Sequence, residues 1–192
     1  ETFRLNFPGM QVYHGDIAKL SVDGCVKLTG LHPGQLDVLD GSPPCQGFST
    51  AGKRVMSDDR NQLFREYVRL LRGLQPKILV MENVSGLVKG KMKLVFAEIM
   101  RELKASGYRV SCRLLNAMYF GVPQSRQRLI WIGVREDLGM MPSHPKAESG
   151  PIGAGRVIGL EGIISDGFPS GTRGLDSPCP TLRKSRALSV KT

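Results

Sequence analysis

The sequence predicts an α/β protein, built on a mainly parallel sheet that ends in an antiparallel pair of strands. Two observations support this prediction. Short β-favouring runs alternate along the chain with longer stretches whose apolar residues recur at helical spacing. The last two runs follow each other with no helix between them. The expected order is strand, strand, helix, strand, helix, strand, strand, which favours a layered fold with helices packed on a sheet.

The first half of the chain supplies two of the expected strands and one helix. Gln11–His14 is a short β-favouring run that stops at a glycine, and Leu36–Leu39 is a second run of the same kind. Residues Ser42–Asp59 contain two adjacent prolines, scattered glycines and several charges, which is typical of a long loop. Asn61–Leu74 has apolar residues on one helical face, with Asn61 as the expected N-cap.

The second half supplies three strands and one helix. Lys77–Met81 is an apolar, partly β-branched run typical of a buried strand, and Met92–Leu103 is amphipathic at helical spacing. Gly107 is placed to end that helix as a left-handed residue. Tyr108–Asn116 and Arg128–Val134 are then expected to form the strand pair at the end of the sheet.

Length and composition suggest one main domain followed by part of another. The chain has 192 residues, and eight of its 23 glycines fall within residues 150–174. We therefore predict a first domain over 1–145, followed by a linker and an incomplete, irregular or β-rich segment over 146–192. No apolar stretch approaches the length of a membrane span, and no signal peptide opens the chain, so we expect no membrane partner and a cytoplasmic location.

Charge and cysteine content narrow the classes of function. Lysine and arginine number 27 against 17 acidic residues, a net charge of +10, which favours a polyanion such as nucleic acid but equally fits a merely basic soluble protein. The four cysteines stand singly, so no paired spacing suggests a zinc module or a redox motif. No metal site is expected.

Three polar clusters fall where the predicted strands end or begin. They are Pro43-Pro44-Cys45-Gln46, Glu82-Asn83-Val84 and Gln124-Ser-Arg126-Gln-Arg128. Ligands bind beyond the carboxyl ends of strands in open α/β sheets, and an antiparallel last strand begins at that same edge. Taken singly, the cysteine fits a small buried residue and the charges fit solvated surface groups. Together they predict a thiol, a carboxylate and two guanidinium groups at one site.

These clusters resemble the signatures of a known enzyme family. Residues 41–49 (GSPPCQGFS), 81–85 (MENVS) and 124–128 (QSRQR) are similar, in order and in spacing, to the Pro-Cys-Gln, Glu-Asn-Val and Gln-x-Arg-x-Arg motifs of the C5-cytosine DNA methyltransferases, prokaryotic type. The likeness covers about residues 5–145. It implies the Rossmann-like fold of S-adenosylmethionine-dependent methyltransferases, with 1–145 as the catalytic domain and 146–192 as part of a target-recognition domain.

The resemblance also implies a reaction and the residues that perform it. Cys45 matches the nucleophile that adds to C6 of a cytosine flipped out of double-stranded DNA, and Glu82 matches the residue at N3 and the 4-amino group. Arg128 matches the contact to O2, with Arg126 in support. The chain would thus be a DNA cytosine-5 methyltransferase acting near the nucleoid of a prokaryote, either as part of a restriction-modification system or as a solitary enzyme.

Further positions match the family's binding residues. For S-adenosylmethionine the resemblance implies Asp16 at the adenine amino group, Ile17 against the ring, and Pro44 and Leu63 along the ribose and methionine. The loop after the nucleophile resembles the family's mobile catalytic loop and supplies polar and basic groups for DNA. These are Gln46, Ser49, Lys53, Arg54 and Arg60.

The chain also departs from the family pattern. It lacks the glycine-rich cofactor loop with its preceding strand, the acidic ribose-binding residue and the C-terminal helix. Without that strand an edge of the sheet would be unpaired, so we expect missing segments or a second chain to complete it, and weak cofactor binding without them. Two alternatives stay open: a tRNA cytosine-5 methyltransferase of the same fold, and a non-catalytic DNA-binding subunit of a split enzyme.

Overall fold

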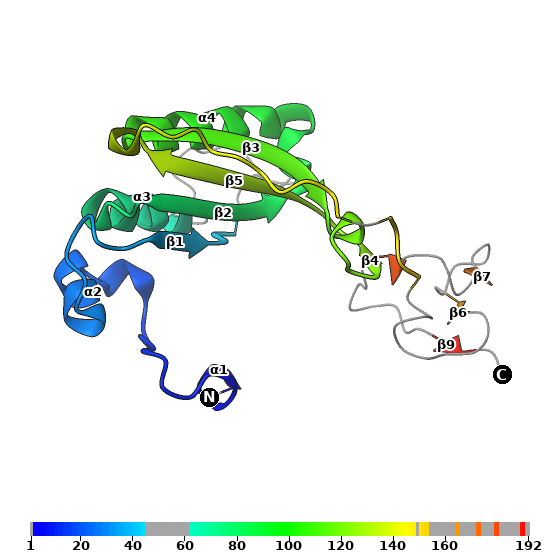
Figure 1. The fold of residues 1–192 in the computed structure, drawn as a ribbon, viewed down its shortest axis with the longest axis horizontal. Coiled ribbons are helices and arrows are strands. Elements are labelled where there is room, and N and C mark those ends of the chain that lie inside the picture. Colours follow the sequence, from blue (N-terminus) through cyan, green and yellow to red (C-terminus); the bar gives the residue numbers. More distant parts are fainter. Residues whose placement is uncertain are drawn as a thin grey trace. The chain divides into compact units, whose positions relative to one another are not determined.

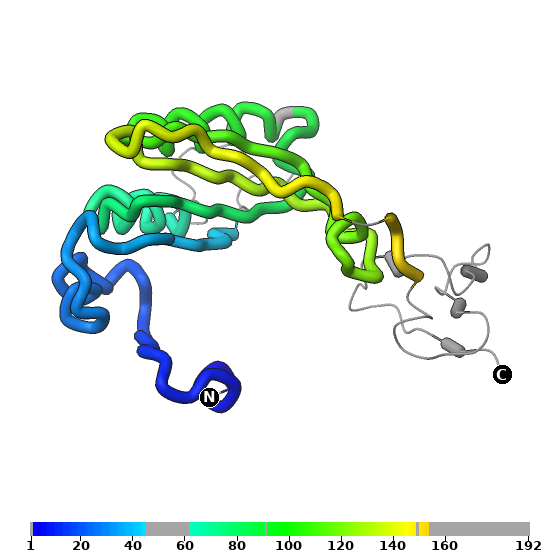
Figure 2. The backbone as a smooth tube through the Cα atoms, in the orientation of Figure 1, coloured from blue at the N-terminus to red at the C-terminus, as the bar shows by residue number. Residues whose placement is uncertain are grey.

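A computed structural model describes most of the first three quarters of the chain. The described residues are 2–44, 62–148 and 150–153, together with the pairs 164–165, 172–173, 179–180 and 189–190. Figure 2 traces the backbone through the two long ranges. The chain divides into two compact units, residues 1–112 with 130–143, and residues 113–129 with 144–192.

A four-stranded sheet forms the framework of the first unit, although the ends of two of its strands, residues 113–116 and 127–129, are assigned to the second unit. Its strands are β1 (Val38–Gly41), β2 (Ile78–Val84), β3 (Tyr108–Asn116) and β5 (Gln127–Arg135), in the order β1-β2-β5-β3. β1 and β2 run parallel with Val38 opposite Ile78, and the arrow of β5 opposes those of β2 and β3 (Figure 1). The expected α/β sheet is confirmed, and so is the antiparallel pair at its end, which is β5 and β3. The sheet is less parallel than the sequence predicts, because β5 also runs antiparallel to β2 and only β1 and β2 run parallel to each other.

Two amphipathic helices cover one face of this sheet. They are α3 (Gln62–Leu74) and α4 (Lys93–Ala105) (Figure 1). Alternate residues of β2 and β5 point toward them and are fully buried, among them Leu79, Met81 and Trp131, whose ring lies 5.6 Å from that of Phe96. The hydrophobic core of the unit therefore lies between the sheet and this helical layer.

The opposite face of the sheet is less covered. Val38 is 47% exposed. Ile78, Val80, Ile130 and Ile132 alternate with the core residues and are only half-buried. We call these five residues the open face. They are apolar, so burying them further would stabilise the fold.

Most predicted elements are confirmed, with shifted ends. The strand expected at 36–39 lies two residues later as β1, and β2 continues three residues beyond Met81, so that Glu82 belongs to the strand. The helices expected from Asn61 and Met92 are α3 and α4. Gly107 has a φ of 88° directly after α4, as expected for a residue that ends a helix.

The strand predicted over Gln11–His14 is wrong. This stretch has no regular secondary structure, although its residues are β-favouring. A strand is stabilised by hydrogen bonds to a neighbour, and no strand pairs with it among the described residues. The sheet prediction failed here because local propensity cannot supply the missing partner.

The sequence prediction also missed helix α2 (Val22–Thr29). Ser21 caps it by accepting a hydrogen bond from the Gly24 amide at 3.0 Å, and Gly30 ends it with a φ of 71°. A five-residue helix, α1 (Thr2–Asn6), precedes it. Single turns of 3-10 helix complete the described structure, at Ile17–Lys19 (η1), Ser85–Val88 (η4), Gly90–Met92 (η5), Ala117–Tyr119 (η6) and Glu136–Leu138 (η7).

Arg135 links the segments that precede β1 and β2. Its guanidinium group donates to the carbonyls of Gly34 and Gln75 and pairs with Asp137 at 2.7 Å. The Tyr108 hydroxyl donates to the Pro76 carbonyl at 2.7 Å beside them. This cluster lies at the end of the sheet away from the polar motifs, so its role is structural.

The second unit contains only short elements among its described residues. The turn η6 precedes the two-residue strand β4 (Gln124–Ser125), which pairs in parallel with β8 (Cys179–Pro180). The strand β6 (Ile164–Ser165) pairs with β7 (Thr172–Arg173) and β9 (Ser189–Val190). The unit takes in 113–129 as well as 144–192, and the functional division at residue 145 stays a prediction.

None of the helices that the structure describes has the length and apolar character needed to cross a bilayer.

Candidate active site

Two polar motifs meet at the carboxyl edge of β1 and β2. The strands are parallel, so the prolines after β1 and the polar end of β2 leave the sheet at the same edge. The Asn83 side chain joins them, since its Nδ2 donates to the Pro43 carbonyl at 2.9 Å. Asn83 is 5% exposed, and its Oδ1 accepts from the Val84 amide at 2.8 Å. This buried amide fixes the backbone two residues before Cys45.

Glu82 lies on the other face of β2 from its neighbours. Met81 and Asn83 point into the core, and the alternation of a strand turns Glu82 to the open face, where it is half-buried. Pro44, at the same edge, is exposed. The structure thus brings Pro44 and Glu82 to one edge of the sheet, as the sequence predicts.

The central residues of the predicted chemistry lie outside the described part of the chain. These are Cys45 and the predicted DNA-binding residues Gln46, Ser49, Lys53, Arg54 and Arg60. The N-cap predicted at Asn61 lies there too, whereas Pro44 and Gln62 are the described residues on either side. In the sequence, the predicted nucleophile Cys45 follows Pro44, and Pro44 follows Pro43, whose carbonyl accepts the hydrogen bond from Asn83.

Asp16 and Ile17, the predicted adenine contacts, form a separate turn. Asp16 Oδ1 accepts from the Ala18 amide at 3.0 Å and so caps the turn η1, while Ile17 is 37% exposed. Among residues 2–44 and 62–148, Oδ2 of Asp16 has no hydrogen-bond partner. A carboxylate oxygen beside an exposed aliphatic side chain fits the amino edge and the face of an adenine.

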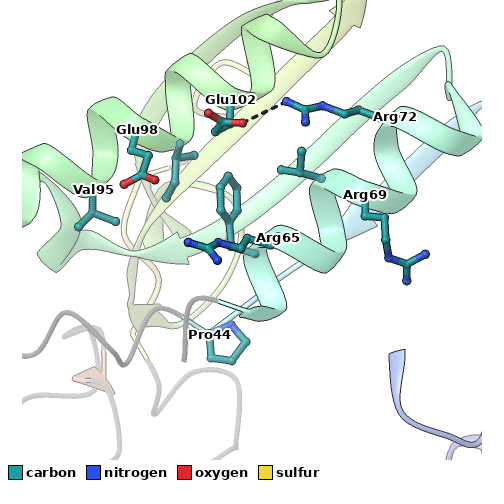
Figure 3. A pocket seen from close by; sticks show the side chains of 10 residues that line it. Pro44, Arg65, Arg69, Arg72, Val95, Glu98 and Glu102 are labelled. Carbon is teal, nitrogen blue, oxygen red and sulfur yellow. Dashed lines mark hydrogen bonds and ion pairs between the residues drawn. The ribbon is translucent and has the colours of Figure 1, made fainter. Parts of the chain in front are cut away.

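A pocket of about 500 Å³ opens between α3 and α4 (Figure 3). Its floor is apolar and its rim is charged, with Arg72 paired to Glu102 at 3.0 Å. The lining residues are Pro44, Phe64, Arg65, Val68, Arg69, Arg72, Val95, Glu98, Ile99 and Glu102. Of the predicted cofactor residues only Pro44 lines it. Asp16, Ile17 and Leu63 do not, so this pocket is not the predicted adenine site.

Arg126 and Arg128 belong to the second unit. Both are half-buried, and Arg128 donates to the Gln127 carbonyl at 2.8 Å. The Asn116 side chain holds the backbone before them: its Oδ1 accepts from the Arg126 amide at 2.9 Å and its Nδ2 donates to Ser125 Oγ at 3.3 Å. The position of these arginines beside Glu82 and Cys45 stays a prediction.

The described cysteines have the electrostatics of buried thiols. Burial raises the pKa of Cys112 from 9.0 to about 12, and burial also raises the pKa of Cys25 despite the nearby Arg69 charge. A raised pKa keeps a thiol protonated and therefore poorly nucleophilic. Neither residue competes with Cys45 as the candidate nucleophile.

Among the described residues, no three His, Cys, Asp or Glu side chains lie close enough together to hold a metal ion.

Sequence reasoning missed the supporting side chains of these sites. The backbones of the motifs are held by hydrogen bonds from Asn83, Asn116 and Arg69. In the sequence, the two asparagines are ordinary residues at the ends of predicted strands, and Arg69 is an ordinary position of a predicted helix. The one usable signal is Asn83, a polar residue at a core-facing position of an otherwise apolar strand. Arg69 and Asn116 act over contacts that only the folded chain shows.

Comparison with known proteins extends the likeness to most of the chain. The family model described as C-5 cytosine-specific DNA methylase matches residues 1–159. The chain is 45% identical over 151 residues to the type II methyltransferase M1.HphI of Haemophilus parahaemolyticus, covering 75% of this chain and 40% of that one. It is 39% identical over 170 residues to M.AquIA of Picosynechococcus sp., covering 84% and 68%.

The fold has solved relatives as well. A DNA modification methyltransferase encoded within an E. coli prophage superposes with a TM-score of 0.63 and 29% identity, covering 79% of this chain and 42% of that chain. The chain thus spans about two fifths of M1.HphI and of the E. coli protein, and about two thirds of M.AquIA.

Proposed function

Because the chain belongs to the C-5 cytosine-specific DNA methylase family, we propose that it forms the catalytic part of a DNA cytosine-5 methyltransferase. The observation that supports this most directly is the junction of Pro43 and Asn83, which anchors the residues before Cys45 at the strand edge that carries Glu82. The relatives named as type II methyltransferases favour DNA over the tRNA alternative, and a role in restriction-modification.

Cys45 would act as the nucleophile. Its thiolate forms a bond from sulfur to C6 of the cytosine, and the C5–C6 double-bond electrons move into the ring. A proton delivered by Glu82 at N3 draws that electron density and stabilises the adduct. C5 thereby becomes nucleophilic and would bond to the methyl group that S-adenosylmethionine supplies when bound, with the sulfur of that cofactor leaving as a neutral thioether. Loss of the C5 proton, return of the N3 proton to Glu82 and breakage of the sulfur–C6 bond would then give the methylated cytosine and the free thiolate.

S-adenosylmethionine, when bound, supplies the methyl group. Asp16 and Ile17 would hold its adenine, and Pro44 and Leu63 would line the remainder. The available Oδ2 of Asp16 and the exposed side chain of Ile17 support this assignment. Arg128 would contact the cytosine O2, with Arg126 beside it.

Double-stranded DNA is the proposed substrate, and it must deliver its cytosine by flipping it out of the stack. Gln46, Ser49, Lys53, Arg54 and Arg60 would contact the DNA from the loop after Cys45. Basic groups that neutralise phosphates release counterions, so binding should weaken as salt rises. This partner, together with the absence of a spanning helix among the described residues, supports a cytoplasmic enzyme of a prokaryotic nucleoid.

We further propose that more strands complete the sheet beside β1. β1 pairs with β2 on one side only among the described strands, and Val38 on the open face is 47% exposed. An unpaired edge next to an apolar face is a site for strand addition. The additional segment, carried by the same protein or by a second chain, would extend the sheet beyond β1 with its strands, cover the open face with the chain that connects those strands, and complete the cofactor site.

A covalent trapping experiment tests the proposed function. The chain, alone and together with the part of M.AquIA that it does not match as the completing segment, is mixed with S-adenosylmethionine and duplex DNA containing 5-fluorocytosine. Fluorine at C5 cannot leave as a proton does, so a stable protein–DNA adduct should accumulate. Cys45→Ser should abolish it, while Cys112→Ser, which removes a half-buried thiol, should leave it unchanged.

Three results would contradict the proposal. An adduct that survives Cys45→Ser would remove Cys45 as the nucleophile. Transfer to tRNA but not to duplex DNA would establish the RNA alternative. Salt-dependent DNA binding with no adduct in either preparation would indicate a non-catalytic subunit.

A further inference from the structure

We propose that Arg69 is a positioning residue for S-adenosylmethionine, because it holds the turn that carries Asp16 and Ile17. This inference rests on the proposed function, which assigns those two residues to the adenine. Arg69 itself would not contact the cofactor. It would act by fixing the backbone from which both contacts project.

The geometry joins two distant parts of the first unit. Arg69 lies on α3, and its Nη2 donates to the carbonyl of Ile17 at 3.0 Å and to that of Leu20 at 2.8 Å. Its Nε pairs with Glu66 Oε2, one turn earlier on α3, at 2.6 Å. A planar guanidinium held by a carboxylate at Nε points its Nη2 donors in a fixed direction.

The turn needs such an anchor. The residues before it, Gln11–His14, form no strand, and Asp16 and Ile17 are exposed. Its own hydrogen bonds are local: Asp16 Oδ1 caps Ala18, and the amides of Lys19 and Leu20 bond back to Asp16 and Ile17. Local bonds shape a turn but do not place it on the domain. Arg69 places it, by bonding carbonyls at both ends of η1.

The same helix carries a second predicted cofactor contact. Leu63 lies at the start of α3, six residues before Arg69. A rigid helix keeps the two positions in register, so Arg69 would set the adenine turn at a fixed place relative to Leu63. Binding groups held in advance lose less entropy when the ligand binds, which raises affinity.

The design compares Arg69 with a matched arginine on the same helix. Arg69→Met keeps the length of the side chain but removes the donors, and Arg69→Lys keeps the charge without the fork. Arg72→Met is the control, since Arg72 pairs with Glu102 and Ser106 and makes no contact with the turn. Asp16→Ala removes the proposed adenine contact directly.

The first measurement is amide hydrogen exchange in the 192-residue chain, which needs no activity. Arg69→Met should raise the exchange rate of the Lys19 and Leu20 amides by about tenfold, the scale of one charge-assisted hydrogen bond. Arg72→Met should leave these amides unchanged, and Arg69→Lys should fall between. Unchanged exchange in Arg69→Met would overturn the inference regardless of the enzyme's activity.

The second measurement is the affinity for S-adenosylmethionine, by titration of the chain with its completing segment. Arg69→Met should weaken binding by about tenfold. The double variant with Asp16→Ala should lose less than the product of the two single losses, because Arg69 acts on affinity in part through Asp16 and in part through Ile17. For the catalysed reaction, the KM for the cofactor should rise while kcat changes little.

The outcomes separate the two proposals. If Asp16→Ala weakens binding and Arg69→Met does not, the positioning role is wrong and the function stands. If the two losses add fully, Arg69 acts elsewhere and the inference is overturned. If Asp16→Ala leaves the affinity unchanged, the assignment of the adenine site fails and takes the role of Arg69 with it.

Discussion

At the scale of single residues, the backbone around the candidate site is held by buried side chains that donate hydrogen bonds to its carbonyl groups. Asn83 reaches the Pro43 carbonyl at the carboxyl edge, and Tyr67 on α3 donates from its hydroxyl to the carbonyls of Leu39 and Val80 at 3.2 and 3.1 Å. Tyr67 thereby spans β1 and β2 from the helical layer. Burial and the Asp40 carboxylate raise the pKa of this tyrosine well above its usual range, so it stays a donor.

Cys112 gives a prediction on pH. Burial raises its pKa from 9.0 to about 12. The protonated thiol is therefore favoured by folding, and this contribution to stability is complete below pH 9 and is lost as pH rises toward 12. At pH 9 the thiol of the folded chain should react with iodoacetamide at least about tenfold more slowly than in the denatured chain, because few thiolates are present.

Mass spectrometry of the peptide that contains Cys112 measures this rate at several pH values. Cys112→Ser serves as the control, since it should remove both the labelled peptide and its share of the alkaline loss of stability. Equal alkylation rates in the folded and denatured chains at pH 9 would show that the thiol is not protected.

At the scale of elements, the contact between β1 and α3 is close enough to require a glycine. A Cβ on Gly41 would lie 2.6 Å from the ring of Tyr67. That ring is 6% exposed and its hydroxyl is bonded to both strands, so it cannot move aside without losing those bonds.

Gly41→Ala should therefore lower the free energy of unfolding by about 1–3 kcal/mol. Gly86→Ala is the matched control, because a Cβ there meets nothing within 4 Å, and it should change stability by less than about 0.5 kcal/mol. Urea unfolding followed by circular dichroism measures both. Equal stability of the two variants would mean that α3 can shift away from β1.

The elements also show how far a sequence can be taken. The periodicity of α3 and α4 survives into the structure because each helix buries its own apolar face. β1 and β2 are also predicted correctly, because each strand buries apolar residues, fully or in part: β1 shows them as an alternating pattern and β2 as an apolar run. Gln11–His14 has equal local propensity yet forms no strand, since pairing is a property of two segments.

The sequence predicted the motif residues of the candidate site but not most of the side chains that support them. Ordered motifs place Pro44 and Glu82 at strand ends, and the parallel pairing of β1 and β2 brings them to one edge. The anchors Asn116 and Arg69 could not be predicted, because their backbone partners lie 10 and up to 52 positions away and only the fold brings them near. Asn83 gave a signal, as a polar residue at a core-facing position, but its partner Pro43 could not be predicted. Helix α2 has capping residues at Ser21 and Gly30 that can be recognised in the sequence, but the prediction relied on apolar spacing and so missed the helix.

At the scale of the whole molecule, the two faces of the sheet differ in how well they are covered. Leu79 is fully buried under the helices, whereas its neighbour Val80 lies half-buried on the open face. In the chain alone, Leu79→Ala should cost about 2–5 kcal/mol, and Val80→Ala about 1 kcal/mol or less.

The balance should change when the completing segment binds. Val80 would then lie between two layers, and Val80→Ala should weaken the assembled protein more than it weakens the isolated chain, while the cost of Leu79→Ala stays the same. Thermal unfolding with and without the segment measures the difference. A cost of Val80→Ala that is identical in both preparations would place the segment elsewhere.

The strand order has a consequence for how the chain is made. β5 lies between β2 and β3, although β3 is synthesised before it. As the chain leaves the ribosome, β3 emerges with no neighbour to pair with, and it must wait until residues 127–135 are also free of the exit tunnel. The nascent protein therefore carries an unpaired apolar strand for the time needed to add some twenty residues, an interval of seconds at most. We expect a chaperone that works at the ribosome to bind this chain most strongly during that interval.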